Sequence, residues 1–232
     1  MVEGAKMSES KDVILGRIRR ALKKEVSDKA DDLLALPDIL RSYEQQSSHS
    51  DEEKLHLFAE RVSEYRAVTE IIAEEDTGER IRTICSESGV KSLVVPGGID
   101  EKWVSTLDDG VRLLRDEPEP LTKEELNNSD AVLTGAFLGV AQTGTIILNA
   151  GTGQGRRVLT LLPDFHICVI RQEQIVGIIP QAIKKLDSTV IETGRPVTMI
   201  SGPSATSDIE LNRVEGVHGP RRLHVLVIKQ KS

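Results

Sequence analysis

The apolar residues near the N-terminus repeat with the period of a helix. The apolar face of this predicted helix consists of Ile14, Ile18, Ala21 and Leu22. The other positions from Arg17 to Lys24 are mostly basic, which would suit a membrane or nucleic-acid arm. Because Asp12 and Glu25 interrupt the positive charge, we favour a docking helix with a solvated basic side.

A polar linker and two more helices follow in the pattern. Residues 26–50 have the composition of a linker. Ser50 and Glu53 have the spacing of a capping box, so a helix is predicted to begin there. A second helix is predicted over residues 77–88. We therefore expect a helical N-terminal arm with its linker over residues 1–50 and an α/β domain over residues 51–232.

Short apolar runs between turn residues predict strands in the remaining chain. The first, Ser92–Val95, ends at Pro96-Gly97-Gly98. Further candidates are Ala131–Thr134, Gly144–Leu148, Val158–Leu162, His166–Arg171, Ile175–Ile179 and Leu223–Ile228. Pro180 can start a short helix over Gln181–Lys185. Strands that alternate with helices predict a mainly parallel sheet flanked by helices, and the short spacings add an antiparallel hairpin region.

Composition narrows the class of protein. The 232 residues are 38% hydrophobic and carry a formal net charge of −7, which argues against nucleic acid as the main partner. No apolar run approaches the roughly 20 residues of a membrane-spanning helix. The two cysteines, Cys85 and Cys168, are too few for a four-cysteine cluster, and we expect both to be inert buried thiols. This usage fits the reducing cytoplasm.

The densest group of polar residues is the turn from Ser201 to Glu210. Gly202, Ser204 and Thr206 are candidates for binding a carboxylate or phosphate, and Asp208 and Glu210 are candidates for acid–base catalysis. Ser207 and Glu210 have capping-box spacing, so a helix is also predicted to begin there. The alternative is that these two residues only cap that helix.

Two other segments carry candidate chemistry. His218 stands between glycines before the last strand, where it could transfer a proton or serve as a structural hydrogen-bonding residue, and Gly219 follows it. Thr143, Gly144 and Thr145 precede an apolar strand and are candidates for ligand binding. The glycine run over residues 151–157 fits neither a dinucleotide fingerprint nor a Walker loop, and hairpin loops with solvated arginines are its simplest interpretation. No metal site is predicted, and the sequence names no cofactor.

Several of these segments together resemble a known family. In order, they are Ala141–Thr145, Leu162–Ile167, Gly202–Glu210 and Gly216–Pro220. This combination is similar to the LUD-domain (lactate utilization protein C-like) family over residues 51–230. The family often has an acidic residue at the position of Gln142, which is a departure here.

The resemblance implies a fold similar to the superfamily of sugar-phosphate isomerases and CoA-transferases. It also implies a role in the oxidation of L-lactate to pyruvate, beside iron–sulfur partner proteins. No firmly assigned catalytic residues come with the family.

Three functions remain open. The chain is expected to be an accessory protein or subunit of the lactate-oxidising system that binds a small organic anion. It could instead be an independent enzyme acting on a phosphorylated or CoA-linked small acid, or a metabolite-sensing binding module. A homo-oligomer is also left open.

Overall fold

The computed structural model describes residues 13–18, 42–207, 213–215 and 219–230, and for residues 188–192, 205–207 and 213–215 it describes the backbone alone. The chain divides into two compact units, Met1–Tyr43 and Glu44–Ser232. In the first unit, residues 13–18 are helical, and the side chains of Val13, Ile14 and Ile18 are exposed. The strands and the other described helices all lie in the second unit.

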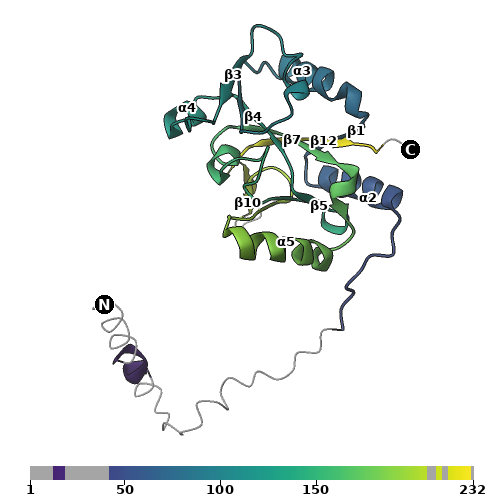
Figure 1. Ribbon diagram of the computed structural model, residues 1–232, viewed down its shortest axis with the longest axis vertical. Coiled ribbons are helices and arrows are strands. Elements are labelled where there is room, and N and C mark those ends of the chain that lie inside the picture. Colours follow the sequence, from purple (N-terminus) through teal and green to yellow (C-terminus); the bar gives the residue numbers. More distant parts are fainter. Residues whose placement is uncertain (1–12, 19–41, 208–212, 216–218, 231–232) are drawn as a thin grey trace. The chain divides into compact units, whose positions relative to one another are not determined.

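A six-stranded, entirely parallel sheet forms the centre of this unit (Figure 1). Its strands, in spatial order, are β1 (Val68–Ile72), β12 (Arg222–Ile228), β7 (Phe165–Arg171), β4 (Ala131–Gly135), β2 (Ser92–Val95) and β3 (Arg112–Arg115). The central strands are buried along almost their whole length because both faces of the sheet are covered. The predicted α/β class with a mainly parallel sheet flanked by helices is confirmed.

A smaller mixed sheet packs on one face of the first. Its strands, in order, are β8 (Ile175–Val176), β5 (Leu138–Val140), β6 (Thr145–Leu148) and β9 (Thr198–Ile200). β6 pairs antiparallel with both β5 and β9, as expected for the hairpin region. α5 (Ile179–Thr193) packs on this sheet through Ala182 and Leu186. β10 (Ala205–Ser207) and β11 (Arg213–Glu215) form a separate antiparallel pair.

Helices and the smaller sheet cover the two faces of the six-stranded sheet. On one face lie α3 (Thr77–Glu87) and η2 (Glu101–Trp103), which share a core with β2 and β7. On the other face lie α2 (Asp51–Glu64), the smaller sheet and α4 (Lys123–Asn127). Figure 1 shows α3 and α5 on opposite sides of the central strands. Short helices η1 (Glu74–Asp76), η3 (Ala141–Thr143), η4 (Arg157–Thr160) and η5 (Gln172–Gln174) connect these elements.

The capping box predicted at Ser50 is present. The Ser50 amide donates to Glu53 Oε2 at 2.7 Å, and the Glu53 amide donates to Ser50 Oγ at 3.3 Å. The apolar face of the helix that begins here packs into the core through Leu55, Phe58 and Val62.

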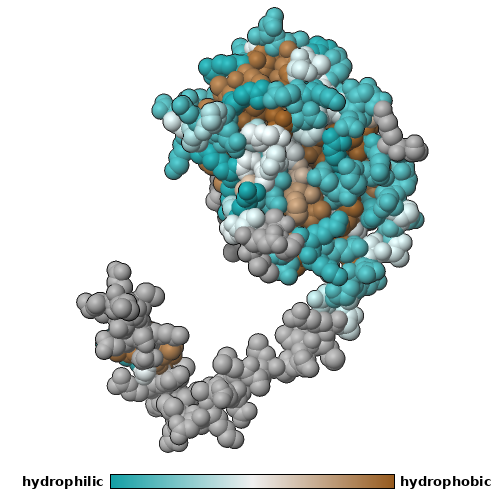
Figure 2. All heavy atoms as spheres, viewed as in Figure 1, coloured by the Kyte–Doolittle hydropathy of each residue, from teal (hydrophilic) through white to brown (hydrophobic). Residues whose placement is uncertain are grey.

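Polar side chains cover most of the visible surface of the unit, with apolar atoms showing between them (Figure 2).

Two predicted strands are wrong, in whole or in part. Val158–Leu162 is not a strand, because η4 turns there and buries Leu159 against Val94 and Val132. The strand predicted over Ile175–Ile179 stops at Val176, since α5 already begins at Ile179. Ser207 is the last residue of β10 and pairs with Arg213, and the helix predicted to begin there falls on residues 208–212, outside the described residues.

Candidate functional site

A cavity of about 310 Å³ opens at the amino ends of β7 and β12, next to the segment that follows β9. The residues that line it are Arg157, Thr160, Leu161, His166, Thr198, Met199, Ile200, Ser201, Gly202, Pro203, Ser204, Gly219, Pro220 and Leu223. We call this space the His166 cavity. Four separate stretches of the chain meet in it, so only the tertiary fold brings these residues together.

His166 is the most deeply buried polar residue of the cavity. As the second residue of β7 it is only 2% exposed, and its Nε2 lies 2.8 Å from Thr134 Oγ1. Burial lowers the pKa of His166 to about 4, so the imidazole is neutral at neutral pH. Within the described ranges nothing hydrogen-bonds to its Nδ1. Because the Thr134 hydroxyl can donate or accept, Nδ1 can accept a proton from a ligand or donate one to it.

Arg157 supplies a positive charge on the exposed side of the same cavity. It is the first residue of η4, and the Thr160 hydroxyl donates to its carbonyl oxygen at 3.2 Å. The part of the chain that the structure describes contains no ion-pair partner for its guanidinium. A guanidinium and a neutral imidazole that line one cavity are suited to a carboxylate with a neighbouring polar oxygen.

A chain of hydroxyl groups reaches the cavity from the smaller sheet. Thr143 Oγ1 lies 2.7 Å from Thr145 Oγ1, which lies 2.8 Å from Ser201 Oγ. Only Ser201 of these three lines the cavity. The predicted ligand-binding residues Thr143 and Thr145 are therefore connected to the cavity through Ser201.

Gly144 lies against α2 and not in the His166 cavity. It adopts a left-handed conformation with φ of 57°, and a Cβ atom there would lie 2.6 Å from the backbone carbon of Arg61 and 2.7 Å from the Val62 nitrogen. The glycine is needed because η3 approaches the backbone of α2 so closely.

Three other predicted ligand-binding residues meet in the cavity, namely Gly202, Ser204 and Gly219. The Ser204 amide donates to the Pro220 carbonyl at 2.8 Å, which joins the two loops. Thr206 lies in β10, where the structure describes its backbone alone. The three predicted catalytic residues, Asp208, Glu210 and His218, lie outside the described residues.

The sequence alone did not identify His166 or Arg157 as site residues. From the sequence, His166 is simply the first residue of a candidate strand, and Arg157 is one of the solvated arginines of the glycine run. One available signal was the position of His166 at the start of an apolar run ending at Ile170, where a histidine becomes buried with the strand. Its pairing with Thr134, 32 residues away, leaves no local signature.

The two cysteines are buried, as predicted. Burial raises the pKa of the Cys85 thiol to about 11 and that of Cys168 to about 12, so neither is a reactive thiolate at neutral pH. In the described ranges, no three His, Cys, Asp or Glu side chains gather to hold a metal ion. None of the helices described there is both long and apolar enough to cross a membrane.

Comparison with known proteins identifies the family. Residues 53–228 match the family model of the LUD domain. The chain belongs to the LUD domain family. Lactate utilization protein C of Deinococcus radiodurans is 46% identical to it over 193 residues, which cover 83% of this chain and 87% of that protein. Lactate utilization protein C of Halalkalibacterium halodurans is 35% identical over 111 residues, or 47% and 48% of the two chains.

A solved structure is similar to this LUD domain protein as well. The crystal structure of a DUF162 family protein from Deinococcus radiodurans superposes with a TM-score of 0.65 at 39% identity. The match covers 78% of this chain and 99% of that one. The family resemblance drawn from the sequence motifs is thus confirmed.

Proposed function

We propose that this LUD domain protein takes part in lactate utilization by binding a small organic anion in the His166 cavity. The proposal makes it an accessory protein or subunit of a system that oxidises L-lactate to pyruvate. Two relatives are named lactate utilization protein C. The observation that carries the proposal is a buried, neutral His166 with no described partner at Nδ1, in a cavity that the Arg157 side chain also lines.

The chemistry of the cavity matches a 2-hydroxy or 2-oxo acid. The carboxylate would pair with the Arg157 guanidinium, since planar guanidinium groups bind carboxylates in a bidentate manner. His166 Nδ1 would accept from a 2-hydroxyl group in one tautomer and donate to a 2-oxo group in the other. The methyl group would lie against Ile200 and Leu223, which also line the cavity.

We assign the electron transfer of lactate oxidation to iron–sulfur partner proteins. Cys85 packs in the core beneath α3 and Cys168 in the core on the opposite face of the sheet, so they cannot ligate one cluster together. We propose that His218, Asp208 and Glu210 serve as acid–base residues, while the partner proteins carry the electrons. His218 directly precedes Gly219, which lines the cavity.

We also propose a helical arm over residues 1–50, an α/β domain over residues 51–232, a fold similar to the sugar-phosphate isomerase and CoA-transferase superfamily, and a cytoplasmic location. A homo-oligomer also stays open. Because similarity of fold is a weak guide to activity, the proposed activity rests on the chemistry of the site.

The test measures binding of L-lactate and pyruvate to the full chain by calorimetry. We expect Arg157→Gln to weaken binding of these acids at least about tenfold, because the cation for the carboxylate is lost. The matched control is Arg112→Gln, which removes an exposed arginine at the far sheet edge and should leave affinity unchanged.

Four results would contradict this proposal. Failure of both acids to bind, or equal affinity in the Arg157 variant, would remove the anion site. Lactate oxidation by the isolated chain without any added redox cofactor would contradict the accessory role and favour an independent enzyme. Saturable binding with no turnover even in the presence of iron–sulfur partners would instead favour a metabolite sensor.

A further inference from the structure

A second cavity, of about 380 Å³, lies at the carboxyl ends of β2, β3 and β4. We call it the carboxyl-end cavity. The residues that define its chemistry are Gly97, Gly98, Glu117, Thr152, Arg156 and Arg195. It shares no lining residue with the His166 cavity.

The topology of the sheet opens a crevice at this place. β2 and β4 are neighbours, but their outgoing connections leave toward opposite faces. The connection from β2 runs through η2 on the face that α3 covers, and the connection from β4 enters the smaller sheet on the other face. In open parallel sheets, ligands bind outside the carboxyl ends of two strands whose connections diverge in this way.

A glycine-rich loop spans the ends of these two strands. The Gly153 amide donates to the Gly97 carbonyl at 2.9 Å, and the Gly153 carbonyl accepts from the Gly135 amide at 2.7 Å. Gly97 follows β2, and Gly135 is the last residue of β4. The loop over residues 151–155, for which the sequence suggested only a hairpin, therefore forms a wall of the crevice.

Two glycines let polar side chains lie directly on the backbone of this cavity. A Cβ atom at Gly97 would overlap the Glu117 carboxylate, and one at Gly98 would overlap the Thr152 methyl group. Gly98 also has φ of 72°, which disfavours other residues. The carboxylate and the threonine are thus held close to the ends of the strands.

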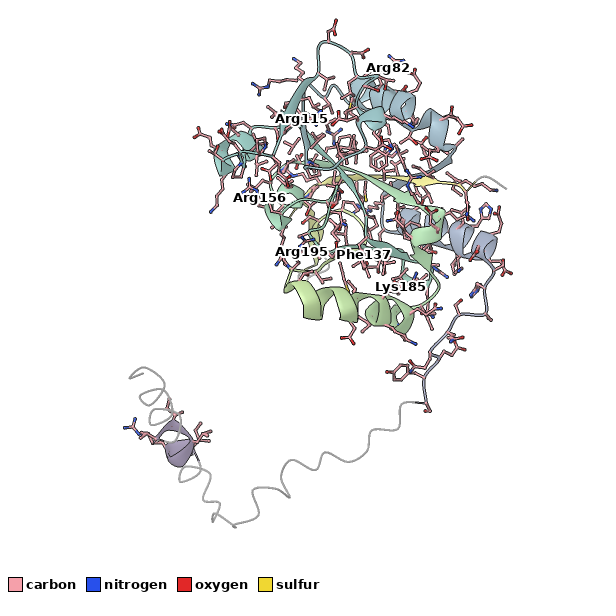
Figure 3. All side chains as sticks on the ribbon, in the orientation of Figure 1. Arg82, Arg115, Phe137, Arg156, Lys185 and Arg195 are labelled. Carbon is pink, nitrogen blue, oxygen red and sulfur yellow. The ribbon has the colours of Figure 1, made fainter. Side chains whose placement is uncertain are left out.

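Three charged side chains line the cavity, namely Glu117, Arg156 and Arg195, and Arg156 is held in an ion pair with Asp116. Arg156 donates to both oxygens of the Asp116 carboxylate, at 2.8 and 2.7 Å, and the Asp116 side chain is only 5% exposed. Across the described ranges neither Glu117 nor Arg195 makes an ion pair. Figure 3 shows Arg156 and Arg195 at the same edge of the unit, where both line the cavity.

We propose that the carboxyl-end cavity is a second binding site and that it takes a phosphate ester carrying a vicinal diol. Arg195 binds the phosphate, and the Glu117 carboxylate accepts hydrogen bonds from the diol. A bare anion would be repelled by Glu117, and a neutral polyol would leave Arg195 unmatched. The combination of a cation and a carboxylate in one cavity therefore selects a ligand with both groups.

Calorimetric titration of the full chain tests this proposal with AMP and glycerol 3-phosphate, which carry both groups. The comparison ligands are 2′-deoxy-AMP, which lacks the vicinal diol, and inorganic phosphate. We expect AMP to bind at least about tenfold more tightly than 2′-deoxy-AMP, because the missing hydroxyl leaves a carboxylate lone pair unmatched. Glu117→Gln should shrink this preference, and Arg195→Gln should weaken AMP binding about tenfold.

Two control variants test whether a loss of AMP affinity is specific to the carboxyl-end cavity. Glu119→Gln removes a nearby exposed carboxylate outside the cavity and should leave AMP affinity unchanged. Arg157→Gln should also leave AMP affinity unchanged, so that failure of this proposal is distinguishable from failure of lactate or pyruvate binding. Absence of binding by both esters, equal binding of inorganic phosphate, or affinities that neither Glu117→Gln nor Arg195→Gln alters would each overturn the second site.

Discussion

The two cavities of this LUD domain protein are built in different ways. The His166 cavity combines side chains from η4, β7, β9, β12 and the loops around Gly202 and Gly219, and its central group is a buried imidazole. Most of the carboxyl-end cavity is built from turns at strand ends, and its charged groups are exposed. The first therefore depends on distant packing, whereas the second depends mainly on the order of the strands.

This difference predicts that destabilising substitutions affect ligand binding at the two cavities differently. A change that loosens the packing of α2 should impair the His166 cavity first, because Gly202 of that cavity lies against Tyr65 at the end of α2. The carboxyl-end cavity should be preserved as long as β2, β3 and β4 stay paired, because two backbone hydrogen bonds of Gly153 tie its loop to Gly97 and Gly135.

The largest effect is expected from Gly144→Ala. The new methyl group would meet the backbone of Arg61 and Val62, and φ of 57° is unfavourable for alanine. We expect a loss of about 3 kcal/mol in the free energy of unfolding, from backbone strain together with the steric overlap. Urea denaturation measures this loss.

Gly89→Ala is the matched control for that variant. Gly89 has a similar φ of 66°, but no atom lies within 4 Å of the position that its Cβ would take. It should lose only about 1 kcal/mol, which is the strain alone. Where the Gly144 variant still folds, pyruvate affinity should fall more than AMP affinity. Equal losses at both cavities would show that they do not differ in the proposed way.

Much of the fold could be predicted because the central strands are continuous apolar runs. Ser92–Val95 and Leu223–Ile228 are buried on both faces, so each produces an unmistakable run. β1 was missed because Thr69 and Glu70 interrupt its apolar pattern, and β3 because arginines stand at both of its ends. An apolar run cannot by itself distinguish a strand from a short helix, which explains the error at Val158–Leu162.

The candidate site was predictable only where loops carried unusual local sequence. Gly202, Ser204 and Gly219 stood out because glycine and hydroxyl residues gather there, and the structure brings them into one cavity. His166 could not be found this way, since its environment comes from Thr134 and from the burial of β7. The crevice at the carboxyl ends of β2 and β4 could not be predicted either, because strand order depends on pairings across the whole chain.

A smaller effect is expected from acidification, and it concerns the His166 cavity. The pKa of His166 is about 4 in the folded chain and about 6.5 when unfolded, so between these values the unfolded chain binds more protons. Stability conferred by the neutral ring is complete above pH 6.5 and is lost as the pH falls toward 4. We expect His166 to account for a loss of about 2 kcal/mol between pH 7 and 5.

Urea denaturation at pH 7 and pH 5 measures that loss. His166→Asn should show a smaller decrease than the original chain. Burial also lowers the pKa of His224, against the effect of Glu70, so His224 adds to the decrease with the same sign. His224→Gln serves as the second reference. A decrease that is unaffected by His166→Asn would mean that the ring is already charged or solvated in the folded protein.

The smallest effect concerns coupling between the cavities. The two cavities are adjacent, because Arg156 lines the carboxyl-end cavity and the next residue, Arg157, lines the His166 cavity. Both also line a space of only about 10 Å³, which holds at most about one water molecule. No ligand can extend through such a gap, so we expect saturation with pyruvate to change the AMP dissociation constant by less than about twofold.

Calorimetric titration of AMP with and without pyruvate measures this coupling, and Arg195→Gln should likewise leave pyruvate affinity within about twofold. A larger change would require η4 to move when either ligand binds, because η4 carries Arg157 and directly follows Arg156. The Arg156–Asp116 pair opposes such movement, since separating it would leave a carboxylate that is only 5% exposed without its partner. Independent binding is therefore the result expected if that pair stays closed, and strong coupling would mean that the two cavities act as one groove.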